Sequence, residues 1–295
     1  MGRQITLVLG SGAARGLAHI GVIRVLEEAG FEISAIAGTS MGALVGGAYA
    51  AGKLDEYTDW VKLLTKRNVL RYLDISFLAS SGILKGDLIM DALNEIMGDH
   101  LIEELPMPYI AVATDLNSRK EVWLTKGKIS SAIRASIAIP GVFSPHRVGG
   151  RWLVDGGLLN PVPVTPAVQT STGFTIAVDV TGPRSANPMG ETTVAARKKP
   201  ERPHNKIDEL LDALHKQLAG GPSETDEQPP LSEILIDAFE TMQETLTRYK
   251  LAANPPDLLI TVPKNICTAH EFFRAEELIE AGAWWARRAL ETAEI

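Results

Sequence analysis

The sequence is poor in cysteine and has no long apolar run. Cys267 is the single cysteine among 295 residues, which excludes an intramolecular disulfide and any metal site built from several cysteines. No stretch approaches the roughly 18 consecutive apolar residues that a membrane-spanning helix needs. The apolar segment at residues 5–9 is also too short for the core of a signal peptide. We therefore expect a cytoplasmic protein.

Positive charge is in short supply as well. Lys and Arg total 29 against 36 Asp and Glu, which gives a formal net charge of −7. This balance argues against a general nucleic-acid-binding surface, although basic residues gather locally between residues 197 and 206. Apolar residues make up 45% of the chain and charged residues 22%. These fractions are close to the globular average and exclude a wholly disordered chain.

Short apolar segments alternate with segments of helical character. Residues 5–9 and 33–37 have the composition of buried strands, and a turn and a predicted helix follow each of them. This alternation predicts an α/β fold with a parallel sheet covered by helices. Further strands are expected at residues 109–114, 121–125, 152–154, 174–180 and 258–262, and helices at residues 16–29, 41–51, 55–66 and 87–97 and from about residue 271.

The composition changes after Thr181. Residues 182–230 are rich in proline, glycine and charge, and we expect a flexible insertion or lid there. The whole chain, residues 1–295, is then one domain, closed by helices and a strand in residues 231–295. An apolar stripe within residues 207–218 fits either an interfacial lid or a helix packed on the core. A second stripe at helical spacing consists of Leu231, Ile234, Leu235, Ala238, Phe239 and Met242.

An aromatic pair near the C-terminus has two interpretations. Trp284 and Trp285 lie beside Arg287 and Arg288. Aromatic and basic residues together are typical of a membrane anchor. Core packing with an exposed arginine face is the favoured interpretation.

The first strand runs into a glycine-rich turn, Leu9-Gly10-Ser11-Gly12-Ala13-Ala14-Arg15-Gly16. Such turns direct backbone N–H groups at an anion near a helix N-terminus. The dinucleotide-binding fingerprint needs a third glycine where Arg15 stands, and the Gly-Lys-Ser/Thr ending of a P-loop is missing. An anion site of another kind and a simple packing turn both remain open.

The second strand runs into Gly38-Thr39-Ser40-Met41-Gly42. A strand, a sharp turn with flanking glycines and a helix form the context of a nucleophile elbow, which predicts Ser40 as a nucleophile. An ordinary helix N-cap is the alternative. Among six histidines, His270 is the best candidate for a triad base. Because only one strand precedes that of Ser40, the arrangement of an ordinary α/β-hydrolase triad fits poorly.

A carboxylate is the better candidate for the base. Asp155 ends a predicted strand and is followed by Gly156 and Gly157. A turn aspartate is the alternative interpretation of this segment. Partial desolvation, to which Trp152 and the nearby glycines could contribute, is expected to raise the pKa of Asp155 above the usual value of about 3.9.

These three ordered motifs resemble the patatin-like phospholipases, and most of all the bacterial members related to neuropathy target esterase. The resemblance covers roughly residues 5–180 and includes Ala18-His19-Ile20-Gly21-Val22, the segment from Ala135 to Phe143, and Asn160-Pro161-Val162-Pro163-Val164. It implies a three-layer α/β/α fold with a mainly parallel central sheet. It also implies a serine acyl hydrolase.

The resemblance assigns a role to each motif. Ser40 would attack an ester carbonyl and Asp155 would accept its proton, so that a Ser-Asp dyad forms an acyl-serine intermediate. The amides of Gly12 and Ala13 would form the oxyanion hole, with Arg15 and Gly16 in the supporting loop. Ser11 and Ala13 occupy positions that relatives often fill with glycine, and the Cβ of Ala13 restricts its backbone.

No cofactor or metal is expected. Asp99, His100, Glu103 and Glu104 crowd together but fit a solvated turn better than a ligand set. The resemblance implies a lipid ester substrate, either a phospholipid or a lysophospholipid, with peripheral contact on the inner membrane surface. An esterase for small soluble esters and a non-catalytic acyl-binding regulatory protein are the alternatives. The residues define neither the acyl chain, the headgroup nor the oligomeric state.

Overall fold

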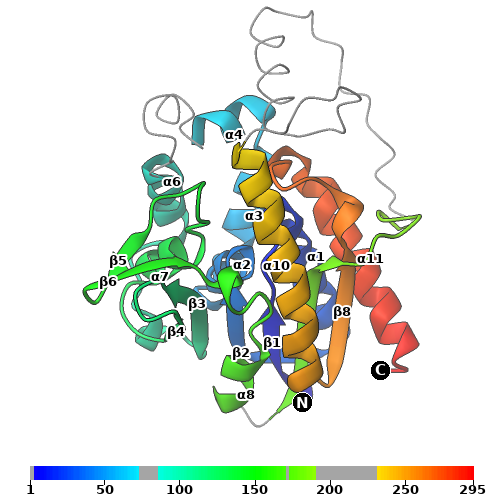
Figure 1. The fold of residues 1–295 in the computed structure, drawn as a ribbon. Coiled ribbons are helices and arrows are strands. Elements are labelled where there is room, and N and C mark those ends of the chain that lie inside the picture. Colours follow the sequence, from blue (N-terminus) through cyan, green and yellow to red (C-terminus); the bar gives the residue numbers. More distant parts are fainter. Residues whose placement is uncertain (1–2, 73–85, 171–172, 191–230) are drawn as a thin grey trace, which may run out of the picture.

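A central sheet of eight strands organises the chain in the computed structural model, which describes residues 3–72, 86–170, 173–190 and 231–295. The strand order is β5-β6-β3-β2-β1-β7-β8, and β4 pairs with β3. Helices cover both faces (Figure 1), so the fold is three-layered α/β/α. The expected fold class is confirmed.

Five neighbouring strands are parallel, and three antiparallel strands extend the sheet beside β3. The parallel strands read as continuous apolar runs because both of their faces are covered. They are β1 (Arg3–Leu9), β2 (Phe31–Thr39), β3 (Tyr109–Asp115), β7 (Phe174–Gly182) and β8 (Leu258–Pro263). The antiparallel strands are β4 (Lys120–Leu124), β5 (His146–Val148) and β6 (Arg151–Asp155).

The larger hydrophobic core lies between the sheet and most of the helices. In β1, Ile5, Leu7 and Leu9 enter this core, while Val8 points to the other face, as the two-residue period of a strand requires. The helices of the larger core are α1 (Ala18–Glu28), α2 (Met41–Ala50), α3 (Leu54–Lys62), α4 (Lys66–Tyr72), α6 (Asp87–Met97), α7 (Ile129–Ser136) and α11 (Ala275–Thr292).

In the part of the chain that the structure describes, the opposite face of the sheet carries a smaller core and two helices. These are α8 (Val164–Thr170) and α10 (Leu231–Ala253), and α10 runs in front of the central strands in Figure 1. Leu251 of α10 packs on the smaller core, as Val164 and Ala167 of α8 do. By contrast, Ile234, Leu235 and Met242 of the apolar stripe near the start of α10 are exposed.

Two helix starts differ from expectation. The helix expected from residue 16 begins at Ala18, because a 3-10 helix, Ala13–Leu17, continues the glycine-rich turn first. Similarly, the helix expected from about residue 271 begins at Ala275, after the 3-10 helix Phe272–Arg274. At both starts, a tight 3-10 turn replaces the first turn of α-helix that the spacing of apolar residues predicts.

The C-terminal tryptophans pack within the protein. Trp285 donates its indole N–H to the carbonyl of Pro188 at 2.8 Å, and Trp284 stacks edge-on against it. Arg288 lies over both rings. These contacts match the core-packing interpretation. The apolar stripe at residues 207–218 lies outside the described residues, as does most of the expected insertion.

Within the described part of the chain, no helix is long and apolar enough to cross a membrane.

Helices α1 and α11 approach each other through glycines. A Cβ on Gly282 would lie 2.0 Å from the carbonyl oxygen of Ala18, and a Cβ on Gly21 would lie 1.9 Å from that of Ile279. Because backbone atoms cannot move aside as a side-chain end can, both positions require glycine.

We therefore expect Gly282→Ala to lower the free energy of unfolding by about 1–3 kcal/mol, the usual cost of overpacking. The higher helix propensity of alanine, worth up to about 1 kcal/mol, acts in the opposite direction. Urea unfolding followed by circular dichroism measures the change. Glu291→Ala, at an exposed position of the same helix, is the control and should stay within about 0.5 kcal/mol. A Gly282→Ala protein as stable as wild type would contradict this close approach.

Candidate active site

The predicted site residues come together at the carboxyl end of the parallel strands. The chain leaves β1 into the glycine-rich turn and leaves β2 into Ser40, while β1 lies between β2 and β7. In open α/β sheets, ligands bind at this end, where the strand order reverses. Antiparallel β6 brings Asp155 to the same place by pairing it with Ala113 of β3.

Ser40 has a strained backbone held by its neighbours. Its φ of 56° and ψ of −121° are unusual for any residue other than glycine. The turn is possible because Gly42 packs directly against β1, where a Cβ would lie 2.0 Å from the carbonyl oxygen of Leu9. The amide of Ser40 donates to Ser136 Oγ at 2.9 Å, and Ser136 Oγ donates to the carbonyl of Val112 at 2.6 Å. This is the geometry of a nucleophile elbow.

The hydroxyl of Ser40 points to a carboxylate and not to its own helix. It makes no N-cap hydrogen bond to α2, and Oγ donates to Asp155 Oδ2 at 2.6 Å. The other carboxylate oxygen, Oδ1, accepts the amide of Gly157 at 2.7 Å. The structure therefore brings the two predicted catalytic residues into direct contact.

Asp155 is fully buried. Burial raises its pKa to about 7, although the hydrogen bonds from Ser40 and Gly157 oppose the rise. A carboxyl group with such a pKa is a much stronger base than an ordinary aspartate.

Trp152 does not contribute to this burial, contrary to expectation. Its side chain is 50% exposed and stacks with Arg147 of the neighbouring strand. Trp152 and Asp155 are three positions apart in β6, so they point to opposite faces of the sheet. The expected contribution of the nearby glycines is seen at Gly156. A Cβ on Gly156 would lie 2.2 Å from the carbonyl oxygen of Val112, so the absence of this atom lets the chain pack closely on β3.

The glycine-rich turn is fixed by backbone hydrogen bonds on both sides of Gly12 and Ala13. Ser11 N donates to the carbonyl of Pro161 at 2.8 Å and Ala14 N donates to that of Ala269 at 3.1 Å. Among the described residues, the amides of Gly12 and Ala13 have no recorded acceptor. Two N–H groups are thus left for a ligand. The turn lies close to Ser40, because its residue Gly16 packs on Met41, which follows Ser40 in the chain.

Ala13 takes a backbone conformation that favours glycine. Its φ is 47°, and a non-glycine residue in the left-handed region costs about 1–2 kcal/mol. Gly12, in contrast, has an extended φ of 166°. The departure from glycine at position 13 therefore leaves strain in the turn, which surrounding contacts must hold.

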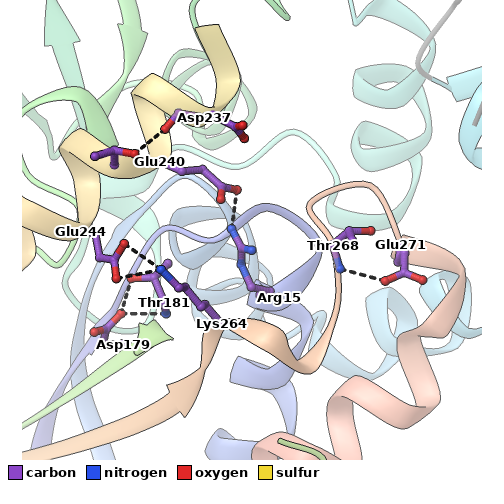
Figure 2. Close-up of polar contacts among 10 residues, drawn as sticks. Arg15, Asp179, Thr181, Asp237, Glu240, Glu244, Lys264, Thr268 and Glu271 are labelled. Atoms are coloured by element: carbon purple, nitrogen blue, oxygen red, sulfur yellow. Dashed lines mark hydrogen bonds and ion pairs between the residues drawn. The ribbon is translucent and has the colours of Figure 1, made fainter. Parts of the chain in front are cut away.

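Arg15 is buried behind this turn. Its Nη2 donates to Glu240 Oε1 of α10 at 2.5 Å (Figure 2). Farther along the same helix, Gln243 covers Gly157, because a Cβ on that glycine would lie 1.9 Å from Gln243 Nε2.

Glu240, Gln243 and Ser136 were not predicted as site residues from the sequence. A signal for the first two existed, because Glu240, Gln243, Glu244 and Thr247 repeat at helical spacing and form one polar face opposite the apolar stripe. Ser136 lay inside a recognised motif, but nothing in its sequence context indicates a contact with the amide of residue 40.

Three histidines of the described chain have partners other than Ser40. His270 Nε2 lies 3.3 Å from Thr268 Oγ1, and His146 Nε2 lies 2.9 Å from Ser131 Oγ. His19 is buried and donates from Nε2 to the carbonyl of Gly10 at 2.8 Å. Burial lowers the pKa of His19 to about 4, so this ring is neutral near pH 7. His204 and His215 lie outside the described residues.

The described residues contain no group of three or more His, Cys, Asp or Glu that could hold a metal ion. In the acidic segment near residue 100, Asp99 pairs with Lys128 at 3.0 Å. Glu103 accepts the amide of Gly127 at 2.7 Å. The carboxylates of Asp99 and Glu103 are thus engaged in ordinary loop contacts.

Comparisons with known proteins show the family of the chain. A sequence model of the family described as "Patatin-like phospholipase" matches residues 7–168. An uncharacterized NTE family protein of Mycobacterium tuberculosis (strain H37Rv) is 42% identical, with 99% of this chain and 92% of the relative covered. Mouse patatin-like phospholipase domain-containing protein 6 is 34% identical over 61% of this chain and 14% of its own length.

Among solved structures, VipD from Legionella pneumophila aligns with a TM-score of 0.48 at 15% identity, covering 99% of this chain and 67% of its own. The matched family segment runs from β1 into α8 and contains the elbow, Asp155 and the glycine-rich turn. The chain belongs to the patatin-like phospholipase family, a family of lipid acyl hydrolases.

Proposed function

We propose that this protein hydrolyses carboxylic esters of phospholipids or lysophospholipids with Ser40 and Asp155 as a catalytic dyad. The observation that carries the proposal is the 2.6 Å hydrogen bond from the elbow serine to a fully buried carboxylate. A nucleophile needs an adjacent base within such a distance. No third residue is required, because the Gly157 amide already orients the carboxylate.

The reaction proceeds through two similar halves. Ser40 Oγ attacks the ester carbonyl carbon while its proton passes to Asp155 Oδ2. The negative charge that develops on the carbonyl oxygen is stabilised by the amides of Gly12 and Ala13. As the tetrahedral intermediate collapses, Asp155 gives the proton to the leaving alcohol and acyl-Ser40 remains. Asp155 then takes a proton from water, the resulting hydroxide attacks the acyl group, and the free acid leaves as Ser40 regains its proton.

Contact with a lipid surface is part of this proposal. Ile234, Leu235 and Met242 of α10 are about half exposed, and α10 carries Glu240 and Gln243 to the site on its other face. An exposed apolar helix face beside the site suits a substrate that enters from a membrane. We propose that the protein is cytoplasmic and binds peripherally to the inner membrane surface.

Replacing the nucleophile should abolish covalent labelling. We expect wild-type protein to react with a fluorophosphonate probe and Ser40→Ala not to react, with ester hydrolysis reduced by at least about 10³-fold. Asp155→Asn should reduce hydrolysis by about 10²–10⁴-fold, because the general base is lost. Mass spectrometry of labelled peptides and product assays measure both effects.

Ser118→Ala, at an exposed position, is the matched serine control and should label as wild type does. Full hydrolysis by Ser40→Ala would overturn the mechanism. Full hydrolysis by Asp155→Asn would overturn the assignment of the base alone. A wild-type protein that binds fatty acids but neither labels nor hydrolyses esters would indicate an acyl-binding protein instead.

The pH dependence should report Asp155. Because burial raises its pKa to about 7 and the base must be ionised, kcat/KM should fall as pH drops through about 7 and level off above it. Chromatographic measurement of the products of a non-ionising ester avoids a pH-sensitive signal. His270→Gln should keep this acidic limb. A limb near pH 4, or its loss in His270→Gln, would contradict a buried aspartate as the base.

Substrate preference separates a lipid hydrolase from an esterase for small soluble esters. We expect hydrolysis to increase with acyl chain length and to extend to phospholipid vesicles. Met242→Ser should weaken vesicle hydrolysis several-fold and leave short soluble esters unaffected, because it removes apolar surface outside the site. Leu63→Ser, at an exposed leucine of another segment, is the control. Activity confined to short esters would favour the soluble-esterase interpretation.

A further inference from the structure

Helix α10 packs over the site with a polar face inward. Gln243 and Thr247 are buried, whereas Ile234, Leu235 and Met242 are exposed. An amphipathic surface helix normally buries its apolar stripe. Polar contacts therefore determine how this half of α10 is placed.

Three side chains of this inward face reach loops at the carboxyl end of the sheet, two of them through ion pairs. Glu240 accepts from Arg15, which follows β1, and Glu244 accepts from Lys264, which follows β8, at 2.9 Å through both carboxylate oxygens. Figure 2 shows both pairs side by side. Gln243, which lies between Glu240 and Glu244 in the sequence, packs against Gly157. A Cβ on Gly157 would lie 1.9 Å from Gln243 Nε2 and 3.0 Å from Asp155 Oδ1.

The two ion pairs differ in burial. The side chain of Arg15 is 8% exposed, and that of Lys264 is 31% exposed. Arg15 Nε is buried and has no hydrogen-bond partner among the described residues. Loss of Glu240 would leave a buried cation without its ion-pair partner, which is far more costly than losing a partner at the surface.

Asp179 is a second carboxylate that interacts electrostatically with Arg15. Its Oδ1 accepts the amide of Thr181 at 2.8 Å and the Thr181 hydroxyl at 2.6 Å (Figure 2). Its pKa is raised by burial and by Glu244 and lowered by Thr181 and Arg15. Thr181 engages Asp179 Oδ1, whereas the Arg15 guanidinium donates its recorded hydrogen bond to Glu240 Oε1.

Arg15 is two residues from the strained Ala13 in the same 3-10 turn. A strained residue keeps its conformation only where the surroundings hold it. We propose that Glu240 is a positioning residue, which fixes Arg15 and thereby aims the amides of Gly12 and Ala13 at the reacting carbonyl. This inference rests on the proposed function, because it assigns those amides to the oxyanion.

The test compares Glu240→Ala with Glu244→Ala, which removes the neighbouring ion pair on the same helix face. Loss of one oxyanion donor costs about 10²–10³-fold, and Glu240 acts on such donors indirectly. We therefore expect Glu240→Ala to lower kcat about tenfold or more, with KM within about twofold of wild type. Glu244→Ala should keep kcat within about twofold. Glu240→Gln, which retains an acceptor without the charge, should lie between them.

A double-mutant cycle shows whether the effect passes through Arg15. The double variant Arg15→Gln, Glu240→Ala should have the same kcat as Arg15→Gln alone, because the two residues act as one unit. Thermal unfolding of each variant shows that it is folded at the assay temperature. If Glu240→Ala is unfolded there, Glu240→Gln takes its place in the cycle.

Three results would overturn the inference. These are an unchanged kcat in Glu240→Ala, an equal loss in Glu244→Ala, and additive losses in the cycle. Failure of the proposed function has a different signature, because the wild-type protein would then lack Ser40-dependent hydrolysis altogether.

Discussion

A hydrogen bond between Ser40 Oγ and Asp155 Oδ2 joins the ends of two strands, β2 and β6, that are far apart in the chain. The packing contacts around both residues hold them in this arrangement. Ser40 keeps a strained backbone because Gly42 lies against β1 and because Ser136 accepts its amide. Asp155 is buried because Gly156 packs on β3, and burial raises its pKa to about 7. This packing therefore places a carboxyl group with a pKa near neutrality beside the serine hydroxyl.

Helix α10 contacts three loops around this hydrogen bond. Its inward face touches the turn after β1, the loop after β6 and the loop after β8 through Glu240, Gln243 and Glu244. Its outward face presents Ile234, Leu235 and Met242. One helix therefore places polar groups at the site and apolar groups at the surface, an arrangement suited to a lipid substrate.

Local patterns predicted the elements well where propensity and packing agree. Strands β1 and β2 contain the apolar runs from which they were predicted, and the helix expected at residues 87–97 has the predicted bounds. The predictions were wrong where a tight turn replaces helix, as at Ala13–Leu17. The expected contribution of Trp152 to the desolvation of Asp155 was also wrong, because strand alternation directs the two side chains to opposite faces of the sheet.

The sequence by itself determined the fold class, the family and the two residues that meet, because short motifs at strand ends carry this information locally. Only the tertiary structure decided that Asp155 is fully buried, that Ala13 is strained and that Glu240 pairs with Arg15, 225 positions away. Burial and long-range pairing depend on how distant elements pack, and no local spacing encodes them. For the same reason, the apolar stripe of α10 was visible in the sequence, while its outward orientation was not.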